Sequence, residues 1–461
     1  MTTLNAYQLN IRAEFEAFLQ LAIPLASAQV AQLATGFVDT VMMGHLGRET
    51  LAAGALASIT FFSIVVTTSG VVMGISPLVA EAFGAGNKTR IEQVTRQGLW
   101  LSLLLAIPIM IAIAHLDRVM LQLGQSPAMV ELAKEYLNIM LWGLFPALGF
   151  AMLRGVVSAL SQARPIFMIV IAGTGFNVVG NYVFGFGKFG FPRLELAGLA
   201  LASVLTLWGM FGALVVYLFT HKQFKTYQFS YRLHQLKPQV LWELVKLGTP
   251  IGVFSALEIG VYTAVSYLMG AWGTDGLAAH QIVFQTMNLI FMVPLGMSFA
   301  ATARIGQWFG QQNLAGIRQA GFVSLAVGTA WTILVAIAFL VFPQHIIGLY
   351  IDINAPENAA IVALATAMMR VGAIAHLFDG IQKIAYGALQ GLQDTRVPMV
   401  LSFVFYWCIG LTSGYWLGFG WNLGGVGLWL GLTLAVAIAA LIFVWRFQTL
   451  TSNEARIKLF S

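Results

Sequence analysis

The two halves of this chain repeat one another, and the repeat restricts the folds that the chain can adopt. The repeated positions are glycines, prolines and small polar residues, and they include Pro24 with Pro250, Gly44 with Gly270, Gly47 with Gly273, Asn87 with Asn313, and Pro165 with Pro398. The offset is 226 residues for the first four pairs and 233 for the last, a drift that a few loop insertions produce. Repeats of this size in an apolar chain predict two pseudo-symmetric bundles around a central cavity, the plan of many secondary transporters.

The composition indicates a membrane protein. Of the 461 residues, 59% are hydrophobic and only 9% are charged, with a mean hydropathy of +0.81, which is too apolar for a soluble protein of this length. Twelve nearly uncharged stretches are each close to the ~20 residues that a helix needs to cross a bilayer. They are residues 19–43, 51–79, 97–116, 133–152, 161–186, 196–220, 245–270, 277–303, 320–342, 358–390, 397–419 and 424–446. Because they do not alternate as barrel strands do, we predict an all-α integral membrane protein with twelve transmembrane helices in two six-helix bundles.

The polar segments predict the domain boundaries and the orientation. The one long polar stretch, 221–244, separates a first bundle at 1–220 from a second at 245–461. With the N-terminus inside, 17 Lys and Arg residues lie in inner segments and 5 in outer segments. We therefore expect both termini and the linker to be cytoplasmic, in the inner (plasma) membrane of a prokaryote. The net charge of +6 is then explained by the basic inner segments, which set the topology and attract anionic lipid headgroups, so nucleic acid is not an expected partner.

Sequence motifs for cofactors give no support for an enzyme. The glycines of 185–190 match a dinucleotide motif, but they end an apolar helix and follow no strand. The stretch 84–89 resembles a phosphate-binding loop, but Asn87 stands where that motif needs the glycine before its lysine. Cys408 is the only cysteine, which excludes disulfides and thiolate metal sites within the chain. We expect no cofactor other than a coupling ion, and any transport must be driven by an ion gradient or run downhill.

Three acids lie within the apolar spans: Asp39, Glu258 and Asp379. A charge there costs at least about 2.5–3.5 kcal/mol on insertion scales, so such residues are functional candidates by default. Burial disfavours an ionised carboxyl group, which lets it take up and release a proton near neutral pH. The same oxygens can instead bind Na⁺, as carboxylates bind other hard cations.

Helical spacing places each acid on a polar stripe. The stripes are Gln32, Thr35 and Asp39 on the first helix, Thr174, Asn177 and Asn181 on the fifth, Ser255, Glu258, Tyr262 and Ser266 on the seventh, and His376, Asp379, Lys383, Tyr386 and Gln390 on the tenth. A wet cavity explains all four stripes, because polar groups that face lipid are unsatisfied. The two asparagines are predicted to join Asp39 around a Na⁺ ion or in a proton relay.

Structural roles are open for the same residues. Asp39 and Glu258 can hydrogen-bond neighbouring helices, and the asparagines can serve as interhelical contacts. Lys383 lies one turn after Asp379, a spacing that predicts a structural ion pair between them. Because Glu258 has no basic residue within one turn, we expect its charge to be more available to a cation than that of Asp379.

Four motifs occur in a specific order along the chain. They are 36–47 (GFVDTVMMGHLG), 278–282 (AAHQI), 292–298 (MVPLGMS) and 390–398 (QGLQDTRVP). Their order and spacing resemble those of the multidrug and toxic compound extrusion (MATE) family. Together with Glu258 and Asp379, they are similar to the NorM branch of that family. The resemblance extends from residue 16 to residue 446 and is reinforced by the duplication.

The resemblance implies a V-shaped pair of bundles that exports drug-like organic cations in exchange for Na⁺ or H⁺. Matched residue by residue, the ion site of the first bundle comprises Asp39, Asn177 and Asn181, with Ser203 where relatives often have threonine. Glu258 and Asp379 match the acidic pair of the second bundle, although Ala375 stands where some relatives carry a tyrosine. Residues expected to line the substrate cavity are Gln32, Thr35, Ser255, Tyr262, Gln281 and Tyr386. Function as a monomer is expected.

Three functions other than export are alternatives for such a chain. A lipid-linked oligosaccharide flippase of the same superfamily needs a strongly cationic cavity for pyrophosphate, yet the mid-span cations are few, Arg370 and Lys383, with Arg154 two residues beyond the span 133–152. A membrane-embedded transferase needs an Asp-rich metal motif in a loop, which this sequence lacks. A channel needs rings of pore-lining polar residues contributed by the subunits of an oligomer. The two-fold internal repeat makes such an oligomer unnecessary.

Overall fold

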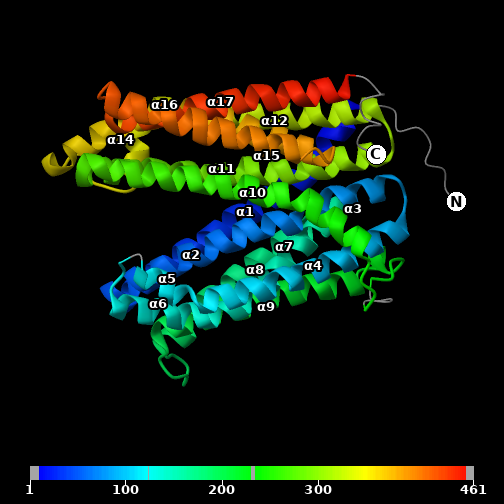
Figure 1. The fold of residues 1–461 in the computed structure, drawn as a ribbon, viewed down its shortest axis with the longest axis horizontal. Coiled ribbons are helices and arrows are strands. Elements are labelled where there is room, and N and C mark those ends of the chain that lie inside the picture. Colours follow the sequence, from blue (N-terminus) through cyan, green and yellow to red (C-terminus); the bar gives the residue numbers. More distant parts are fainter. Residues whose placement is uncertain (1–9, 123, 230–233, 453–461) are drawn as a thin grey trace. The chain divides into compact units, whose positions relative to one another are not determined.

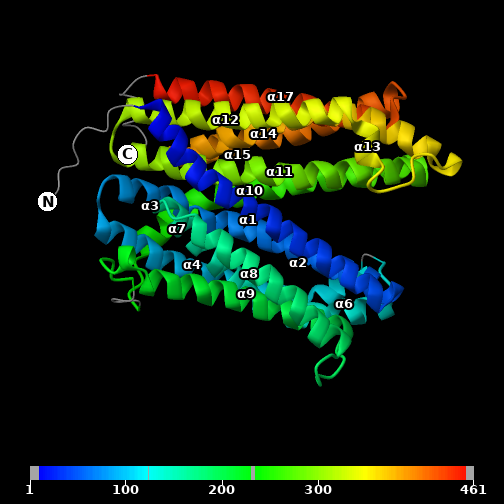
Figure 2. The ribbon, with the colours of Figure 1, turned by 180° about the vertical axis from the view of Figure 1, so that it is seen from behind.

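A computed structural model describes residues 10–122, 124–229 and 234–452 (Figures 1 and 2). Within these ranges all regular structure is helical. Eleven helical runs in the described ranges are long and apolar enough to cross a membrane. Ten of them each overlap one predicted span, and the eleventh, Pro238–Gly310, is 73 residues long and contains two, so the predicted all-α fold is confirmed.

The chain forms two compact units. Ser27–Gly252 is one unit, called the N-unit here, and the residues before Ser27 join those after Gly252 in the other, the C-unit. Both boundaries fall inside long helices, α1 (Ile11–Leu46) and α10 (Pro238–Met269). Each of these helices therefore begins in one unit and ends in the other. The boundaries are themselves 226 residues apart, which is the offset of the sequence repeat.

Besides its parts of α1 and α10, the N-unit contains the following elements in chain order. They are α2 (Arg48–Met73), α3 (Ile75–Gly84), α4 (Lys88–Ala114), α5 (Leu116–Gln122), α6 (Pro127–Met140), the 3₁₀ turn η1 (Leu141–Gly143), α7 (Leu144–Ala159), α8 (Arg164–Gly180), the π-helical segment η2 (Asn181–Gly185), α9 (Glu195–Thr220) and the 3₁₀ turn η3 (Lys222–Phe224).

The C-unit contains the remaining elements. They are the 3₁₀ turns η4 (Gly270–Trp272) and η5 (Pro356–Asn358), the helices α11 (Gly273–Gly310), α12 (Leu314–Val341), α13 (Pro343–Ile347), α14 (Ala359–Gly391), α15 (Arg396–Ser402), α16 (Thr412–Tyr415) and α17 (Gly424–Thr451), and the π-helical segments η6 (Phe403–Leu411) and η7 (Trp416–Gly420).

Repeated residues perform the same structural task in both halves. Asn87 caps α4 by accepting a bond from the Arg90 amide at 3.0 Å, and Asn313 caps α12 in the same way at 2.9 Å from the Gly316 amide. Gly47 and Gly273 each turn the chain between two long helices with a positive φ, +139° and +78°, which side chains rarely adopt. The duplication in the sequence is therefore a duplication of caps and turns.

Small residues let α10 approach the other helices of the N-unit closely. A Cβ atom added to Gly248 would lie 1.8 Å from the Val71 carbonyl oxygen, and one added to Gly70 would lie 2.6 Å from Gly252 Cα. In the C-unit, a Cβ added to Gly296 would lie 2.3 Å from Ala26 Cα. Gly296 is the repeat of Gly70, and Gly252 is the repeat of Ala26. Backbone-to-backbone packing of this kind is typical of membrane helices, where small residues allow van der Waals contact.

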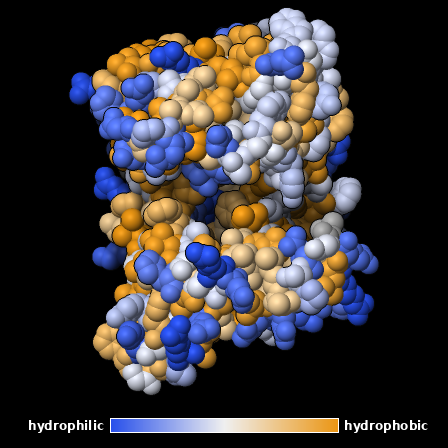
Figure 3. Space-filling view, turned by 90° about the vertical axis from the view of Figure 1, so that its left-hand side faces the viewer, coloured by the Kyte–Doolittle hydropathy of each residue, from blue (hydrophilic) through white to orange (hydrophobic). Residues whose placement is uncertain are grey.

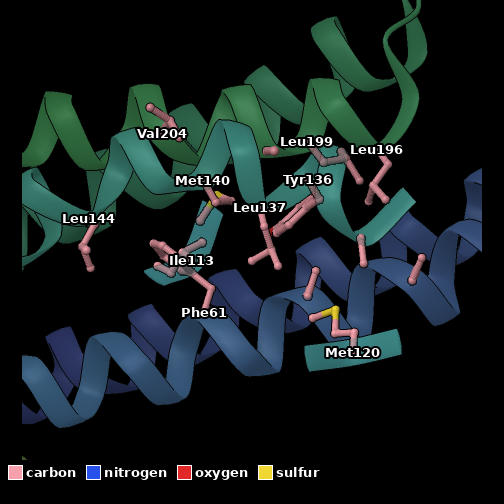
Figure 4. Close-up of a cluster of buried hydrophobic side chains, with 14 of the residues drawn as sticks. Phe61, Ile113, Met120, Tyr136, Leu137, Met140, Leu144, Leu196, Leu199 and Val204 are labelled. Carbon is pink, nitrogen blue, oxygen red and sulfur yellow. The ribbon is translucent and has the colours of Figure 1, made fainter. Parts of the chain in front are cut away.

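The core of each unit is apolar and tightly packed. In the N-unit, Phe61 of α2, Tyr136 and Leu137 of α6, and Leu199 of α9 belong to one buried cluster (Figure 4). In the C-unit, α14 packs against α11, α12 and α17.

Large apolar side chains are also exposed along the helices, as lipid-facing side chains must be. Figure 3 shows the surface at the left-hand side of Figure 1, where hydrophilic residues are mixed with apolar ones.

Candidate functional site

The polar residues predicted around Asp39 form a continuous hydrogen-bonded chain in the N-unit. Asn181 Nδ2 donates to Asp39 Oδ1 at 2.5 Å and lies 3.2 Å from Asn177 Oδ1. Asn177 Nδ2 donates in turn to Ser203 Oγ at 3.2 Å. The two asparagines are at most 1% exposed and Ser203 is 9% exposed, while Asp39 is half-buried. The structure thus brings together all four residues predicted for this site, from α1, α8, η2 and α9.

The local backbone explains how the amides reach the carboxylate. Asn181 is the first residue of the π-helical segment η2, where the wider turn interrupts the regular α-helical register after α8. Single turns of this type are frequent at functional sites. Gly180, directly before it, packs against Ala202 of α9, so α8 and α9 approach closely beside the site.

The ligand set suits a hard monovalent cation or a proton. Asn181 Oδ1 is buried and has no hydrogen-bond partner among the described residues. This oxygen belongs to the same side chain that hydrogen-bonds Asp39. A cation bound beside it would therefore meet one carboxylate together with neutral amide and hydroxyl oxygens. Hard cations prefer such oxygen ligands. The described ranges contain no group of three His, Cys, Asp or Glu side chains that could hold a metal ion.

Two further polar contacts extend from this site along α1. Thr35 and Thr174 hydroxyls are 2.8 Å apart, as expected for two predicted stripes that face each other. Gln32 is half-buried, and its Oε1 lies 3.4 Å from Arg154 Nη1. Arg154 also donates to Gln29 Oε1 at 2.6 Å.

Arg154 corrects one part of the topology argument. It follows the predicted span 133–152 and is one of the 17 basic residues assigned to the inner segments, but it lies within α7 and is only 9% exposed. Its guanidinium is bound to glutamine side chains of α1 inside the N-unit. Helical spacing does not pair these residues, because they are more than 120 positions apart.

The acidic pair of the C-unit has a different partner from the one predicted. Lys383 Nζ contacts Glu258 Oε2 at 2.6 Å, and both side chains are largely buried. The same ammonium lies over the rings of Phe254 and Phe291, 5.0 and 5.2 Å from their centroids. The predicted Asp379–Lys383 ion pair is therefore wrong. Lys383 reaches across to α10 because a carboxylate and an aromatic face there both stabilise its charge.

Asp379 is consequently the less compensated of the two acids. It is 9% exposed, and its Oδ1 has no hydrogen-bond partner within the described part of the chain. The side-chain amide of Gln382 and the hydroxyl groups of Tyr386 and Tyr406 are also buried without partners in that part. Buried polar atoms normally find partners, so this cluster has the capacity to bind water, an ion or a polar ligand.

The remaining predicted cavity residues occupy varied positions. Tyr386 is 3% exposed, with its ring stacked on Phe254 at a centroid distance of 3.9 Å. Ser255 and Tyr262 are half-buried on α10, and Gln281 is exposed on α11. His280, beside Gln281, is fully buried and lies 2.9 Å from the Ser266 hydroxyl through Nε2, which is a structural role.

Comparison with known proteins decides the family. The MatE family model matches residues 24–183 and 250–416, one match in each half of the repeat. This chain belongs to the MatE family. It is 53% identical over 438 residues to the probable multidrug resistance protein NorM of Synechocystis sp., covering 95% of both chains. It is 52% identical over 444 residues to the probable multidrug resistance protein NorM of Synechococcus sp., covering 96% of both.

The fold of this MatE protein also matches solved transporter structures. A MOP superfamily transporter from Pyrococcus furiosus superposes with a TM-score of 0.87 over 99% of this chain and 100% of that one, at 20% identity. The family model and the NorM relatives confirm the predicted resemblance to NorM-like MATE transporters.

Proposed function

We propose that this MatE-family protein is a secondary antiporter that exports drug-like organic cations in exchange for Na⁺ or H⁺. The observation that carries the proposal is the Asp39 carboxylate, held by Asn181 within an otherwise apolar helix bundle. The multidrug resistance names of its NorM relatives support the substrate class. We further propose that it acts as a monomer in the inner membrane, with both termini and the 221–244 linker in the cytoplasm.

The exchange follows from the charge on Asp39. An ionised Asp39 attracts an organic cation, whereas a carboxyl neutralised by a proton or Na⁺ does not. Binding of the coupling ion and binding of the drug therefore oppose each other, which is the thermodynamic requirement for antiport. Asn181 holds Asp39 Oδ1 with one N–H, and its own free Oδ1 is available to an incoming cation or a protonated carboxyl.

The C-unit contributes a second acidic site to the proposal. Lys383 offsets the charge of Glu258, so that Asp379 is the acid available to a cation. The neighbouring tyrosine hydroxyls and Gln382 supply neutral polar groups. The sequence predicted the opposite, that Glu258 is more available to a cation than Asp379. The reversal rests on the contact between Lys383 and Glu258.

A flippase for lipid-linked pyrophosphate is not favoured. Such a protein needs cations that are available to an anion. Of the three cations considered for such a cavity, Lys383 is bound to Glu258 and Arg154 to Gln29 and Gln32, and the exposed Arg370 alone does not make a strongly cationic cavity.

Transport in proteoliposomes tests the proposed function. Purified protein is reconstituted, a fluorescent organic cation is supplied, and either a Na⁺ gradient or a pH gradient is imposed. We expect one of the two gradients to drive uphill accumulation of the dye. Accumulation with neither gradient, or dye movement that only follows its own concentration gradient, contradicts antiport.

A further inference from the structure

The ammonium group of Lys383 lies in a site with the composition of an organic-ammonium site. Besides Glu258 Oε2 at 2.6 Å, the ammonium has two phenyl rings around it, with the ring centroids of Phe254 and Phe291 at 5.0 and 5.2 Å. A cation over aromatic faces is the arrangement that recognises quaternary ammonium ligands. Glu258, Phe254 and Phe291, which come from α10 and α11, are called the ammonium box here (Figure 1).

Neighbouring rings hold one wall of the ammonium box in place. Phe254 is fully buried, and its ring stacks on that of Tyr386 at a centroid distance of 3.9 Å. The ring of Tyr406 meets Phe254 edge-on at 6.4 Å. Because neither ring contact involves Lys383, we expect this wall to keep its position if the ammonium leaves. The Glu258 side chain is 13% exposed, so its carboxylate is not sealed off from a ligand.

The repeat shows that the fold does not require the ammonium box or its occupant. The counterparts of the box residues in the first half, at the offset of 226 residues, are Ala28 for Phe254, Gln32 for Glu258 and Val65 for Phe291. The turns that follow α7 and α14 have a positive φ at Ser161 and Gln393, which are 232 residues apart. At this offset Lys383 corresponds to Ala151. In the first half all four positions therefore carry different residues, as expected if the four residues act together.

A second acid lies one helical turn from Lys383. Asp379 precedes it by four residues on α14, a spacing that brings two side chains together on one face of a helix. Asp379 Oδ1 is buried and has no hydrogen-bond partner in the described part of the chain. Asp379 also interacts electrostatically with both Glu258 and Lys383. The flexible lysine side chain thus has a second carboxylate beside it, so its ammonium can leave the box and stay paired.

We propose that the ammonium box binds the cationic group of the transported compound and that Lys383 is a tethered competitor for this site. Lys383 occupies the box in the described structure. When an organic ammonium enters, the lysine moves to Asp379 and the ligand takes its place beside Glu258. This inference rests on the proposed export of organic cations and names their contacts in the second bundle. A neutral compound cannot replace the lysine without leaving Glu258 buried and unpaired.

The movement of Lys383 links the two acids of the second bundle. While the ligand occupies the box, Asp379 is paired with the lysine and has no charge left for a coupling ion. An ion bound at Asp379 returns Lys383 to Glu258 and displaces the ligand. The two ligands therefore oppose each other, as antiport requires.

Equilibrium binding without any gradient tests the role of Lys383. The purified full-length protein in detergent is titrated with benzyltrimethylammonium in a calorimeter. Wild type binds the ligand only when lysine has left the box, so we expect Lys383→Met to lower the Kd by about tenfold or more, the effect of a box that is empty for about a tenth of the time or less. Arg370→Met removes an equal charge from an exposed position of the same helix and is the matched control, expected to bind as wild type does.

Variants of the two acids test the box and the exchange separately. Glu258→Gln/Lys383→Met is expected to lose the gain in affinity, because the box then lacks its carboxylate. Asp379→Asn is expected to weaken binding, since Lys383 has no second acid to move to. The same change in the Lys383→Met background should have no effect. If Asp379→Asn weakens binding equally in both backgrounds, Asp379 contacts the ligand directly and the exchange is overturned.

Lys383→Arg keeps the test decisive if Lys383→Met does not fold. The guanidinium retains the charge and can bind a carboxylate through two parallel hydrogen bonds, so it is expected to stay in the box and to weaken binding of the ligand. Binding that no Lys383 variant changes contradicts this inference alone. No binding by wild type or by any variant contradicts the proposed organic-cation substrates as well.

Discussion

The ion pair between Lys383 and Glu258 makes an asymmetric prediction about stability. Their side chains are 7% and 13% exposed, so water compensates little if one partner is removed. Removing one member of a buried pair typically costs about 3–5 kcal/mol, because the other charge stays buried and unpaired. Lys383→Met leaves the Glu258 carboxylate buried without its ammonium partner. For a unit of this size, a loss of about 3 kcal/mol lowers the thermal midpoint by about 6 °C or more.

Glu258→Gln is expected to cost less than Lys383→Met. The ammonium it leaves behind still lies over Phe254 and Phe291, and a desolvated cation–π contact is worth about 2 kcal/mol. The double variant Glu258→Gln/Lys383→Met removes both charges and is expected to recover most of the stability, since neutral replacement of a buried pair is often tolerated.

Thermal unfolding in detergent, followed by size-exclusion chromatography after heating, measures all three variants beside wild type. Lys188→Met, which removes an exposed lysine, is the matched control and should leave the midpoint unchanged. If the two single variants lose the same stability and their effects add in the double variant, the charges are not paired as described.

Two further predictions concern transport and packing. Asp379→Asn is expected to impair drug export more than Glu258→Gln, at equal amounts of membrane-inserted protein, because Lys383 already offsets Glu258; a more severe Glu258 variant in the vesicle efflux assay would restore the order predicted from sequence. Gly248→Ala forces a Cβ against the Val71 carbonyl and is expected to cost about 1–3 kcal/mol of unfolding free energy. Gly209→Ala, where no atom lies within 4 Å of the added Cβ, is the control, and equal thermal midpoints for the two variants would exclude close packing at Gly248.

Much of the fold could be predicted because it depends on local patterns. Each transmembrane helix is set by a run of apolar residues, and the repeat identifies equivalent caps such as Asn87 and Asn313. The Asp39 site was also predictable, since helical spacing places Asn177 and Asn181 on one face and the family resemblance joins them to Asp39. The distances among these residues confirm that they lie together.

The remaining features depend on contacts between helices, which spacing on a single helix does not reveal. Lys383 is within one turn of Asp379, yet a carboxylate and two aromatic rings on other helices determine its position. Arg154 looked like a loop charge because it lies near the end of an apolar stretch, and its glutamine partners are on α1. The π-helical turn at Asn181 likewise has no signature in the sequence pattern.

Gradient-driven export by Asp39→Asn protein tests the account most directly. The amide keeps the shape of the side chain but cannot gain or lose charge, so coupling should be lost while insertion and thermal stability are retained. Asp275→Asn, at an exposed acid at the start of α11, is the matched control and should transport as wild type does. In proteoliposomes with an imposed Na⁺ or pH gradient, we predict no uphill accumulation of an organic cation by Asp39→Asn. Accumulation at the wild-type rate would contradict the role of Asp39 as the coupling residue.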